Sequence, residues 1–294
     1  MPVANLTQVF KNAINDDYAI GAFNIHNLEF VEGVMRAAEE MSSPVIIGIA
    51  TISIDYAGLE PLAAIAKDYA ERSQIPTVIH LDHGDKIELV RRSIELGFSS
   101  VMYDGSKYPI DENIKKTREI VKIAHDRKIS VEGEVGVVGG FEGLTGGDVS
   151  HDQLRKLYTR PEEAERFVAE TGVDALAVSV GTVHGMPIQK ADIDFGRLKE
   201  IHEAVDVPLV FHGCTGLKNE DYHRAIALGV KKFNVGTRLM IAYQQALKSA
   251  IGQDENSLFS CLNAGTEAVK AAVKDRITIL KSAAKGSLKY NFTF

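Results

Sequence analysis

The chain has 294 residues, of which 45% are hydrophobic and 25% are charged, an ordinary composition for a globular protein. Its formal net charge is −7 and it has no block of basic residues, which argues against nucleic acid or an anionic membrane as its main partner. The amino terminus lacks the basic start and apolar run of a signal peptide, and the uncharged stretch at residues 41–54 is too short to span a membrane, so we expect a cytoplasmic protein.

Apolar runs typical of buried strands alternate along the chain with amphipathic helical patterns. We predict eight strands, at residues 19–24, 45–50, 77–82, 100–103, 130–134, 175–180, 209–212 and 232–235. Helical patterns fall between them, at residues 30–41, 60–72, 113–127, 161–171, 196–204 and 220–228. This alternation predicts an α/β fold, a (β/α)8 TIM barrel, with an open doubly wound sheet as the alternative. We expect a single domain over residues 1–294, with a C-terminal helical extension at about 238–282.

The stretch Thr77–Asp85, TVIHLDHGD, begins as a buried strand and turns polar where that strand should end. Asp82 and His83 stand at this point, and Gly84 follows them. Asp85, with a glutamate three residues later, is a suitable N-cap for the next helix. A carboxylate and an imidazole at the exit of a buried strand indicate a functional site, and a helix cap beside a surface histidine is the simpler alternative.

Polar side chains also stand at or just after the ends of the first predicted strand and of the fourth to the eighth. They are Asn24, Asp104, Glu134, His184, His212, Asn234 and Thr237. In a barrel of this kind the carboxyl ends of the strands form one rim, where the chemistry takes place. We therefore expect these side chains to converge on one pocket.

Three of the histidines, His83, His184 and His212, fall at separate strand ends with carboxylates beside them. Three imidazoles on rigid supports suit a catalytic zinc ion that keeps one position open for substrate. Asp104 and Glu134 are expected either to orient the histidine rings or to ligate a metal at an alternative position. His80 is ambiguous, because it can equally be a histidine packed inside the barrel.

Glycine turns follow the last three predicted strands, at residues 181–185, 213–216 and 234–237. Each offers backbone N–H groups and a hydroxyl, and TIM barrels often bind phosphate after strands seven and eight. Another loop, at residues 136–147, holds six glycines among twelve residues. We expect this loop to be mobile, either as a surface connection or as a lid over the site.

Six motifs resemble, in order, those of the class II, zinc-dependent ketose-bisphosphate aldolases: GAFNIHN at 21–27, HLDHG at 80–84, VEGEVG at 131–136, VGTVHG at 180–185, FHGCTG at 211–216 and FNVGT at 233–237. The resemblance covers about residues 5–282. The family includes fructose-1,6-bisphosphate and tagatose-1,6-bisphosphate aldolases, and the compact length of this chain is more similar to the tagatose type.

The resemblance implies a Zn²⁺ ion on His83, His184 and His212 that polarises the substrate ketone. It implies that Asp82 exchanges a proton with the C4 hydroxyl as the C3–C4 bond breaks, and that Glu142 moves the proton at the donor carbon. Asp104 and Glu134 match family residues near the metal. We assign six residues to substrate, of which all but the first match family positions around the donor phosphate and a structural Na⁺ or K⁺: Asn24, Gly185, Gly213, Thr215, Asn234 and Thr237.

The chain departs from the family pattern where it would contact substrate. Cys214-Thr215 replaces the usual Gly-Ser or Ala-Ser, and residues 253–261 contain no arginine to hold a distal phosphate. The donor half of the site is therefore expected to be intact, whereas the acceptor half is left open.

We expect an aldolase that reversibly cleaves fructose or tagatose 1,6-bisphosphate to dihydroxyacetone phosphate and glyceraldehyde 3-phosphate, as in glycolysis. The alternatives are a family member with a different aldehyde acceptor, a zinc hydrolase, and a non-catalytic binding protein. A lysine-dependent aldolase is disfavoured, because Lys231 and Lys232 stand at the wrong end of the eighth predicted strand. The expected partner is a small-molecule sugar phosphate, and the resemblance implies a homodimer or homotetramer.

Overall fold

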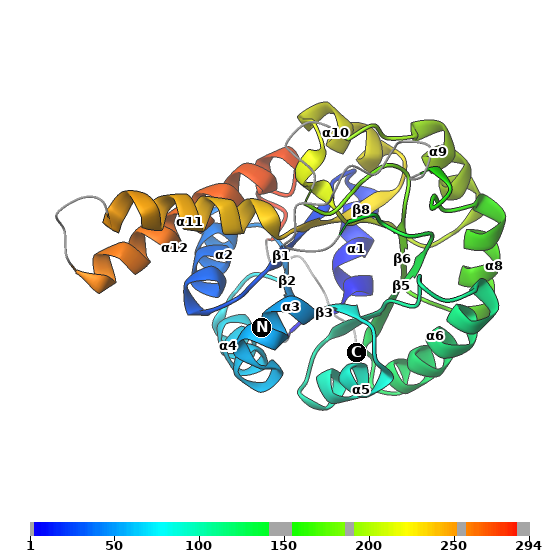
Figure 1. Ribbon diagram of the computed structural model, residues 1–294, viewed down its shortest axis with the longest axis horizontal. Helices are drawn as coiled ribbons and strands as arrows, with labels where there is room; N and C mark the ends of the chain where they lie inside the picture. Colours follow the sequence, from blue (N-terminus) through cyan, green and yellow to red (C-terminus); the bar gives the residue numbers. More distant parts are fainter. Residues whose placement is uncertain (1–2, 141–154, 186–190, 252–256, 287–294) are drawn as a thin grey trace.

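Parallel strands close into a barrel in which each strand pairs with the next along the chain and the last pairs with the first (Figure 1). The structure is a computed structural model that describes residues 3–140, 155–185, 191–251 and 257–286. The strands are β1 (Ile20–Asn24), β2 (Val45–Ala50), β3 (Thr77–Gly84), β4 (Ser100–Tyr103), β5 (Ser130–Val135), β6 (Ala175–Val178), β7 (Leu209–Phe211) and β8 (Val230–Val235). The predicted (β/α)8 TIM barrel is confirmed.

Helices surround the barrel, and the last two extend from one side of it, at the left of Figure 1. They are α1 (Leu6–Asn15), α2 (Leu28–Glu40), α3 (Thr51–Ala57), α4 (Leu59–Arg72), α5 (Ile87–Glu95), α6 (Ile110–His125), α8 (Pro161–Thr171), α9 (Phe195–Ala204), α10 (Asn219–Ala227), α11 (Thr237–Ile251) and α12 (Leu258–Ile279), with a short 3-10 turn η1 (Cys214–Gly216). None of these described helices is long and apolar enough to cross a lipid bilayer.

Helix α1, which the sequence patterns did not reveal, closes the amino-terminal end of the barrel. Its apolar residues Leu6, Val9 and Phe10 form one buried cluster with inward-facing residues such as Ile20 and Val78. Side chains alternate between the two faces of a strand, so Val78, His80 and Asp82 follow one another up the inside of β3. The interior therefore changes from apolar at the α1 end to polar at the carboxyl rim.

Helix α12 fastens the C-terminal part of the chain to the barrel through α2. Val269, Val273 and Ile277 are buried in the main hydrophobic core. A Cβ atom on Gly33 of α2 would lie 2.9 Å from the carbonyl oxygen of Thr266, so the two helices approach each other at a residue that has no side chain. Burial of these apolar side chains removes them from water, which favours the packing of α12 on the rest of the protein.

The end of β3 differs from the prediction. The strand continues to Gly84, two residues beyond the predicted end, with an irregularity in its pairing to β4 between Leu81 and Gly84. The predicted N-cap at Asp85 is wrong, because Lys86 occupies the N-cap of α5 and no side chain caps that helix. Asp85 instead lies 3.3 Å from the Nζ of Lys107. The longer strand shifts the start of the helix past Asp85.

Candidate active site and metal centre

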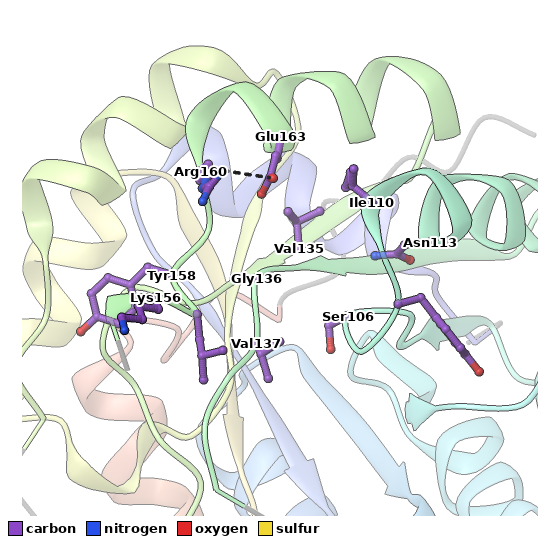
Figure 2. A pocket seen from close by; sticks show the side chains of 12 residues that line it. Ser106, Ile110, Asn113, Val135, Gly136, Val137, Lys156, Tyr158, Arg160 and Glu163 are labelled. Carbon is purple, nitrogen blue, oxygen red and sulfur yellow. Dashed lines mark ion pairs between the residues drawn. The ribbon is translucent and has the colours of Figure 1, made fainter. Parts of the chain in front are cut away.

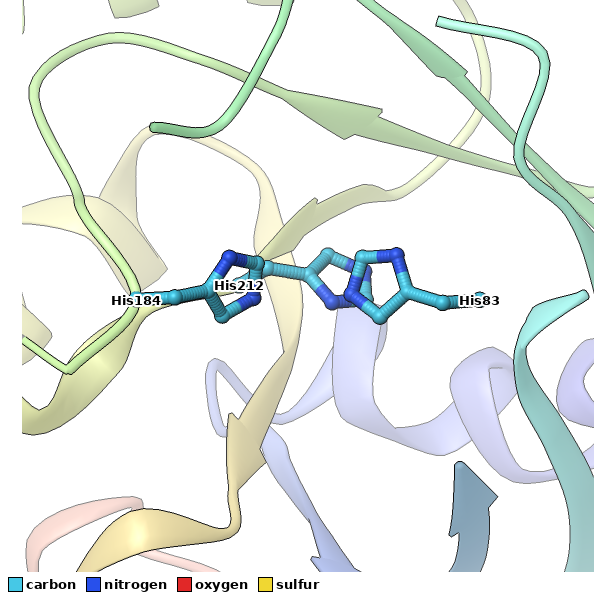
Figure 3. Close-up of side chains that lie close together, drawn as sticks. All are labelled: His83, His184 and His212. Carbon is cyan, nitrogen blue, oxygen red and sulfur yellow. The ribbon is translucent and has the colours of Figure 1, made fainter. Parts of the chain in front are cut away.

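Three imidazoles from separate strand ends meet at the carboxyl rim of the barrel (Figure 3). His83 belongs to β3, His184 follows β6 and His212 directly follows β7. The ring of His83 lies 4.4 Å from that of His212 and 5.2 Å from that of His184, measured between centroids. One ring nitrogen from each histidine lies within 4.8 Å of one from each of the others. The barrel thus brings together residues up to 129 positions apart in the sequence.

Two of these rings fit a metal site because each has one buried nitrogen without a hydrogen-bond partner among the described residues. His184 Nε2 and His212 Nδ1 are buried, and neither has a hydrogen-bond partner among the described residues. Burial lowers the pKa of His184 to about 3 and also lowers the pKa of His212. Both rings are therefore neutral near pH 7, with lone pairs that can bind a metal. A buried nitrogen without a partner is costly, and a bound metal ion would remove that cost.

Two carboxylates, the partly exposed Asp104 and the buried Glu132, hold two of the rings in place. Asp104 Oδ2 lies 2.9 Å from His83 Nδ1, and Asp104 Oδ1 accepts hydrogen bonds from the backbone N–H and the hydroxyl of Ser106. Burial works to raise the pKa of Asp104, but the hydrogen bond and charge of His83, together with the two hydrogen bonds from Ser106, outweigh it and the pKa is lowered. Glu132 Oε1 lies 2.9 Å from His212 Nε2. Carboxylates placed behind histidine ligands commonly fix their orientation and tautomer.

Sequence reasoning missed Glu132 and singled out Glu134 two positions later. Both project into the barrel from β5, because alternate residues of a strand share a face. The signal that was available is the motif VEGEVG itself, which places two carboxylates on the interior face of a buried strand.

Glu134 forms a second group of possible metal ligands with His83 and Asp104, also within 4.8 Å of one another. Burial, and then the charge of Asp104, raises the pKa of Glu134 well above its usual value. Its Oε2 atom is buried and has no hydrogen-bond partner in the described part of the chain. Asp104 contacts His83 in a way that orients its ring. His83, Asp104 and Glu134 are also close enough together to hold a metal at the alternative position.

The backbone at His83 is strained. Its φ is +50°, in the left-handed region that side chains rarely adopt. A Cβ atom on the following residue, Gly84, would lie 2.7 Å from both Leu81 Cδ2 and the carbonyl oxygen of Met102, so glycine is required there. Strain of about 1–3 kcal/mol is tolerated mainly at functional positions. The strained backbone lies near the end of β3, where the polar residues Asp82 and His83 follow each other.

Asp82 is fully buried beside these rings and is held by two amides. Its Oδ2 accepts a hydrogen bond from Asn24 Nδ2 and its Oδ1 accepts one from Asn234 Nδ2, both at 2.8 Å. Its Oδ1 lies 3.8 Å from His212 Nδ1. Burial alone would raise the pKa of Asp82, but the nearby His83 and His212 lower it far below its usual value. Asp82 is therefore an oriented, ionised proton acceptor.

The structure gives Asn24 and Asn234 a contact that the sequence did not predict. Their amide nitrogens bind Asp82, whereas they were expected to contact substrate. Their Oδ1 atoms are buried and have no hydrogen-bond partner among the described residues, so they remain able to accept from a substrate hydroxyl.

The residues expected around the donor phosphate do lie together. Gly185, Gly213, Thr215, Asn234 and Thr237 line one small cavity next to His184. Gly213 has a φ of +65°, and a Cβ atom there would lie 2.7 Å from the backbone of Val183, which explains the glycine. Cys214 in the same turn is buried, and burial raises its pKa to about 12, so its thiol is a poor nucleophile.

A larger cavity of about 330 Å³ opens over the histidines. It is lined by Thr51, His83, Asp85, Asp104, Ser106, Glu134, Val137, Val138, Gly140 and His184. These described lining residues include no lysine or arginine. The cavity is large enough for a small sugar phosphate, but its described lining offers no side-chain cation for a distal anionic group.

A further cavity of about 250 Å³ shares Ser106 and Val137 with the cavity over the histidines (Figure 2). It does contain basic residues, Lys156 and Arg160, and Arg160 lies 3.9 Å from Glu163. Only the beginning of the glycine-rich loop is described, where the carbonyl of Gly139 accepts a hydrogen bond from the backbone N–H of His184. Glu142 and the rest of the expected lid lie outside the described residues.

Comparison with known proteins shows the family of the chain. The family model described as class II fructose-bisphosphate aldolase matches residues 4–285. The chain is 32% identical to the YdjI aldolase from Escherichia coli K12, with a TM-score of 0.86 over 97% of this chain and 100% of that one. It is 31% identical to a proposed fructose-1,6-bisphosphate aldolase from Coccidioides immitis, with a TM-score of 0.87 over 97% and 99% of the two chains.

A third structure, the fructose-bisphosphate aldolase of Campylobacter jejuni, is 21% identical, with a TM-score of 0.79 over 95% of each chain, and supports the fold alone. The family resemblance found in the motifs is confirmed by the match across nearly the whole sequence. The chain belongs to the class II fructose-bisphosphate aldolase family.

Proposed function

We propose that this protein is a zinc-dependent aldolase that reversibly cleaves fructose or tagatose 1,6-bisphosphate to dihydroxyacetone phosphate and glyceraldehyde 3-phosphate. One observation carries the proposal. An ionised carboxylate, Asp82, is clamped by two amides and lies 3.8 Å from a ring nitrogen of His212 that has no hydrogen-bond partner among the described residues. A positioned base beside a three-imidazole ligand set is what metal-dependent aldol cleavage requires.

The residues have separate tasks in this proposal. His83, His184 and His212 would hold the metal, which supplies Lewis acidity at the substrate ketone when bound. Asp82 accepts the proton of the C4 hydroxyl as the C3–C4 bond breaks, which leaves an aldehyde, and it returns that proton in the reverse direction. Asn24 and Asn234 keep the carboxylate pointing at that hydroxyl. Glu142 is proposed to move the proton at the donor carbon.

The acceptor end supports a second candidate within the same family, an aldolase for substrates without a distal phosphate. The described residues that line the cavity over the histidines include no cation. A distal phosphate would instead have to reach the adjoining cavity, where Lys156 has no ion-pair partner among the described residues. The two candidates differ in whether a group on the far end of the sugar gains affinity there.

Kinetics on matched substrates separate these candidates. The purified protein is assayed with fructose and tagatose 1,6-bisphosphates and with the corresponding 1-phosphates. Lys156→Met should raise the KM for a bisphosphate but not for a 1-phosphate if the distal phosphate binds in the adjoining cavity. Arg155→Met is the matched control, because Arg155 is the preceding residue and does not line that cavity. No cleavage of any ketose phosphate by folded, zinc-loaded protein would contradict the aldolase proposal.

A further inference from the structure

A buried lysine and glutamate lie inside the barrel next to the histidines, and the reaction proposed above does not use the lysine. Lys232 on β8 and Glu132 on β5 are both fully buried, with Lys232 Nζ 2.8 Å from Glu132 Oε2 and 3.1 Å from Oε1. Glu132 Oε1 is also the atom that accepts the Nε2–H of His212. The pair thus connects β8 and β5 to His212 at the end of β7.

Such a pair is an expensive way to fill a barrel. Removing two charges from water costs free energy that their attraction only partly returns, and apolar side chains of similar size are often as stable. The end of this same barrel near α1 is filled with apolar residues. Lys232 is not placed to act as a nucleophile, because it is fully buried, and its Nζ donates a hydrogen bond to Oε1 of Glu132 and forms an ion pair with Oε2. The pair therefore calls for a role other than packing.

The position of a neighbouring histidine, His80, indicates that this role is to orient Glu132. His80 Nε2 lies 3.7 Å from Glu132 Oε2, is buried, and has no hydrogen-bond partner among the described residues. Its other nitrogen, Nδ1, lies 2.8 Å from the hydroxyl of Ser100. Glu132 therefore has two imidazoles within reach, His80 and His212. Lys232 contacts both oxygens of Glu132 and so limits the rotation that would exchange one imidazole for the other.

We propose that Lys232 is a positioning residue for the metal centre. By anchoring Glu132, it directs Oε1 to the Nε2–H of His212, so that His212 presents Nδ1 to His83 and His184. The inference rests on the proposed function, since it assumes that these three histidines hold the metal. It adds that a residue with no contact to metal or substrate determines how tightly the metal is held.

Zinc affinity of the metal-free protein tests this, measured by competition with a chromophoric chelator. Lys232→Met and Glu132→Gln should each weaken zinc binding about 10- to 100-fold, the usual effect of losing a group behind a metal ligand. The matched control is Lys231→Met. Lys231 is the adjacent buried lysine, but its Nζ donates to the carbonyl of Ile226 and lies 3.6 Å from Asp17, away from Glu132. The control should keep wild-type zinc affinity.

A second variant covers the case in which Lys232→Met alone does not fold, because it leaves a buried carboxylate without its counter-charge. Glu132→Gln/Lys232→Met removes both charges and should fold while binding zinc at least about 10-fold more weakly. The visible spectrum of the cobalt-substituted variants should also change, which a purely structural role would not produce.

Wild-type zinc affinity in any folded variant that lacks Lys232 would overturn the inference. Failure of both Lys232 variants to fold, while Lys231→Met folds, would also overturn it by assigning Lys232 to folding. If the wild-type protein itself does not bind zinc, the proposed function fails instead, so the two failures are distinguishable.

Discussion

The side-chain amide of Asn234 donates a hydrogen bond to Oδ1 of Asp82 at 2.8 Å, and this contact joins β8 to β3 inside the mouth of the barrel. Asn24 holds the other carboxylate oxygen from β1 at the same distance. Two neutral donors stabilise the ionised form of Asp82 and fix the plane of the carboxylate. The base is therefore set in place before substrate arrives, which favours proton transfer over a short path.

Asp82→Ala should retain zinc and lose turnover. Loss of a positioned proton acceptor costs about 10²- to 10⁴-fold in rate. Zinc should remain bound, because in our proposal three histidines hold the metal and Asp82 does not. Steady-state cleavage and zinc content measured on the same preparation check this. A variant with near-normal kcat would show that another group takes the proton.

Asn234→Ala should lower kcat. The lost hydrogen bond to a charged group is worth about 1.5–3 kcal/mol, which corresponds to roughly 10- to 150-fold. Because Asn234 also borders the expected phosphate site, its steady-state kinetics are compared with those of Asn24→Ala, which removes the other amide donor and does not line that cavity. Near-normal kcat in both variants would contradict the role of the two amides.

The metal-free protein should lose stability as the pH falls below about 6.5. Burial lowers the pKa of His80 and His184 to about 3 and that of His26 to about 4, whereas in the unfolded chain they keep ordinary values near 6.5. Between these values the unfolded chain binds protons that the folded chain does not. The free energy of unfolding should therefore fall by up to about 1.4 kcal/mol per pH unit for each histidine.

Urea denaturation of chelator-treated protein from pH 7 to pH 5 measures this slope. His26→Asn is the control, because it removes one of these three imidazoles and should make the slope shallower. A free energy of unfolding that does not change over this interval would show that these histidines are not buried in the neutral form.

Native protein should expose one thiol to a water-soluble disulfide reagent and unfolded protein two. Cys214 is 2% exposed, its Sγ donates to the carbonyl of Phe211, and burial raises its pKa to about 12, so the reactive thiolate is scarce. Cys261 on α12 is partly exposed and serves as the internal control. Rapid modification of Cys214 with loss of cleavage would reveal an accessible thiol in the phosphate turn.

The sequence was most informative about the strand ends. Polar residues such as Asp82, His184 and His212 interrupt apolar runs, and the closed parallel barrel has a single rim on which the ends of such runs must meet. Their convergence could therefore be anticipated from the strand pattern without knowing any distance. Glu142, by contrast, depended on the resemblance alone, and it lies outside the described residues.

Other features required coordinates. The pairing of Glu132 with Lys232 joins two residues 100 positions apart in the sequence. The local sequence around a charged residue in a strand does not show which residue it pairs with. Asp85 looked like a helix cap because its local pattern is correct, but the strand before it runs two residues further than expected. Local patterns predicted which residues are unusual, whereas tertiary pairing determined what each of them contacts.

Anomalous diffraction from crystals of the zinc-loaded protein, recorded on both sides of the zinc absorption edge, tests the central claim most directly. Our account predicts one strong peak bonded to His83, His184 and His212, and loss of that peak together with aldol cleavage in His212→Ala. A zinc peak elsewhere, or full cleavage by protein shown to be free of metal, would contradict it.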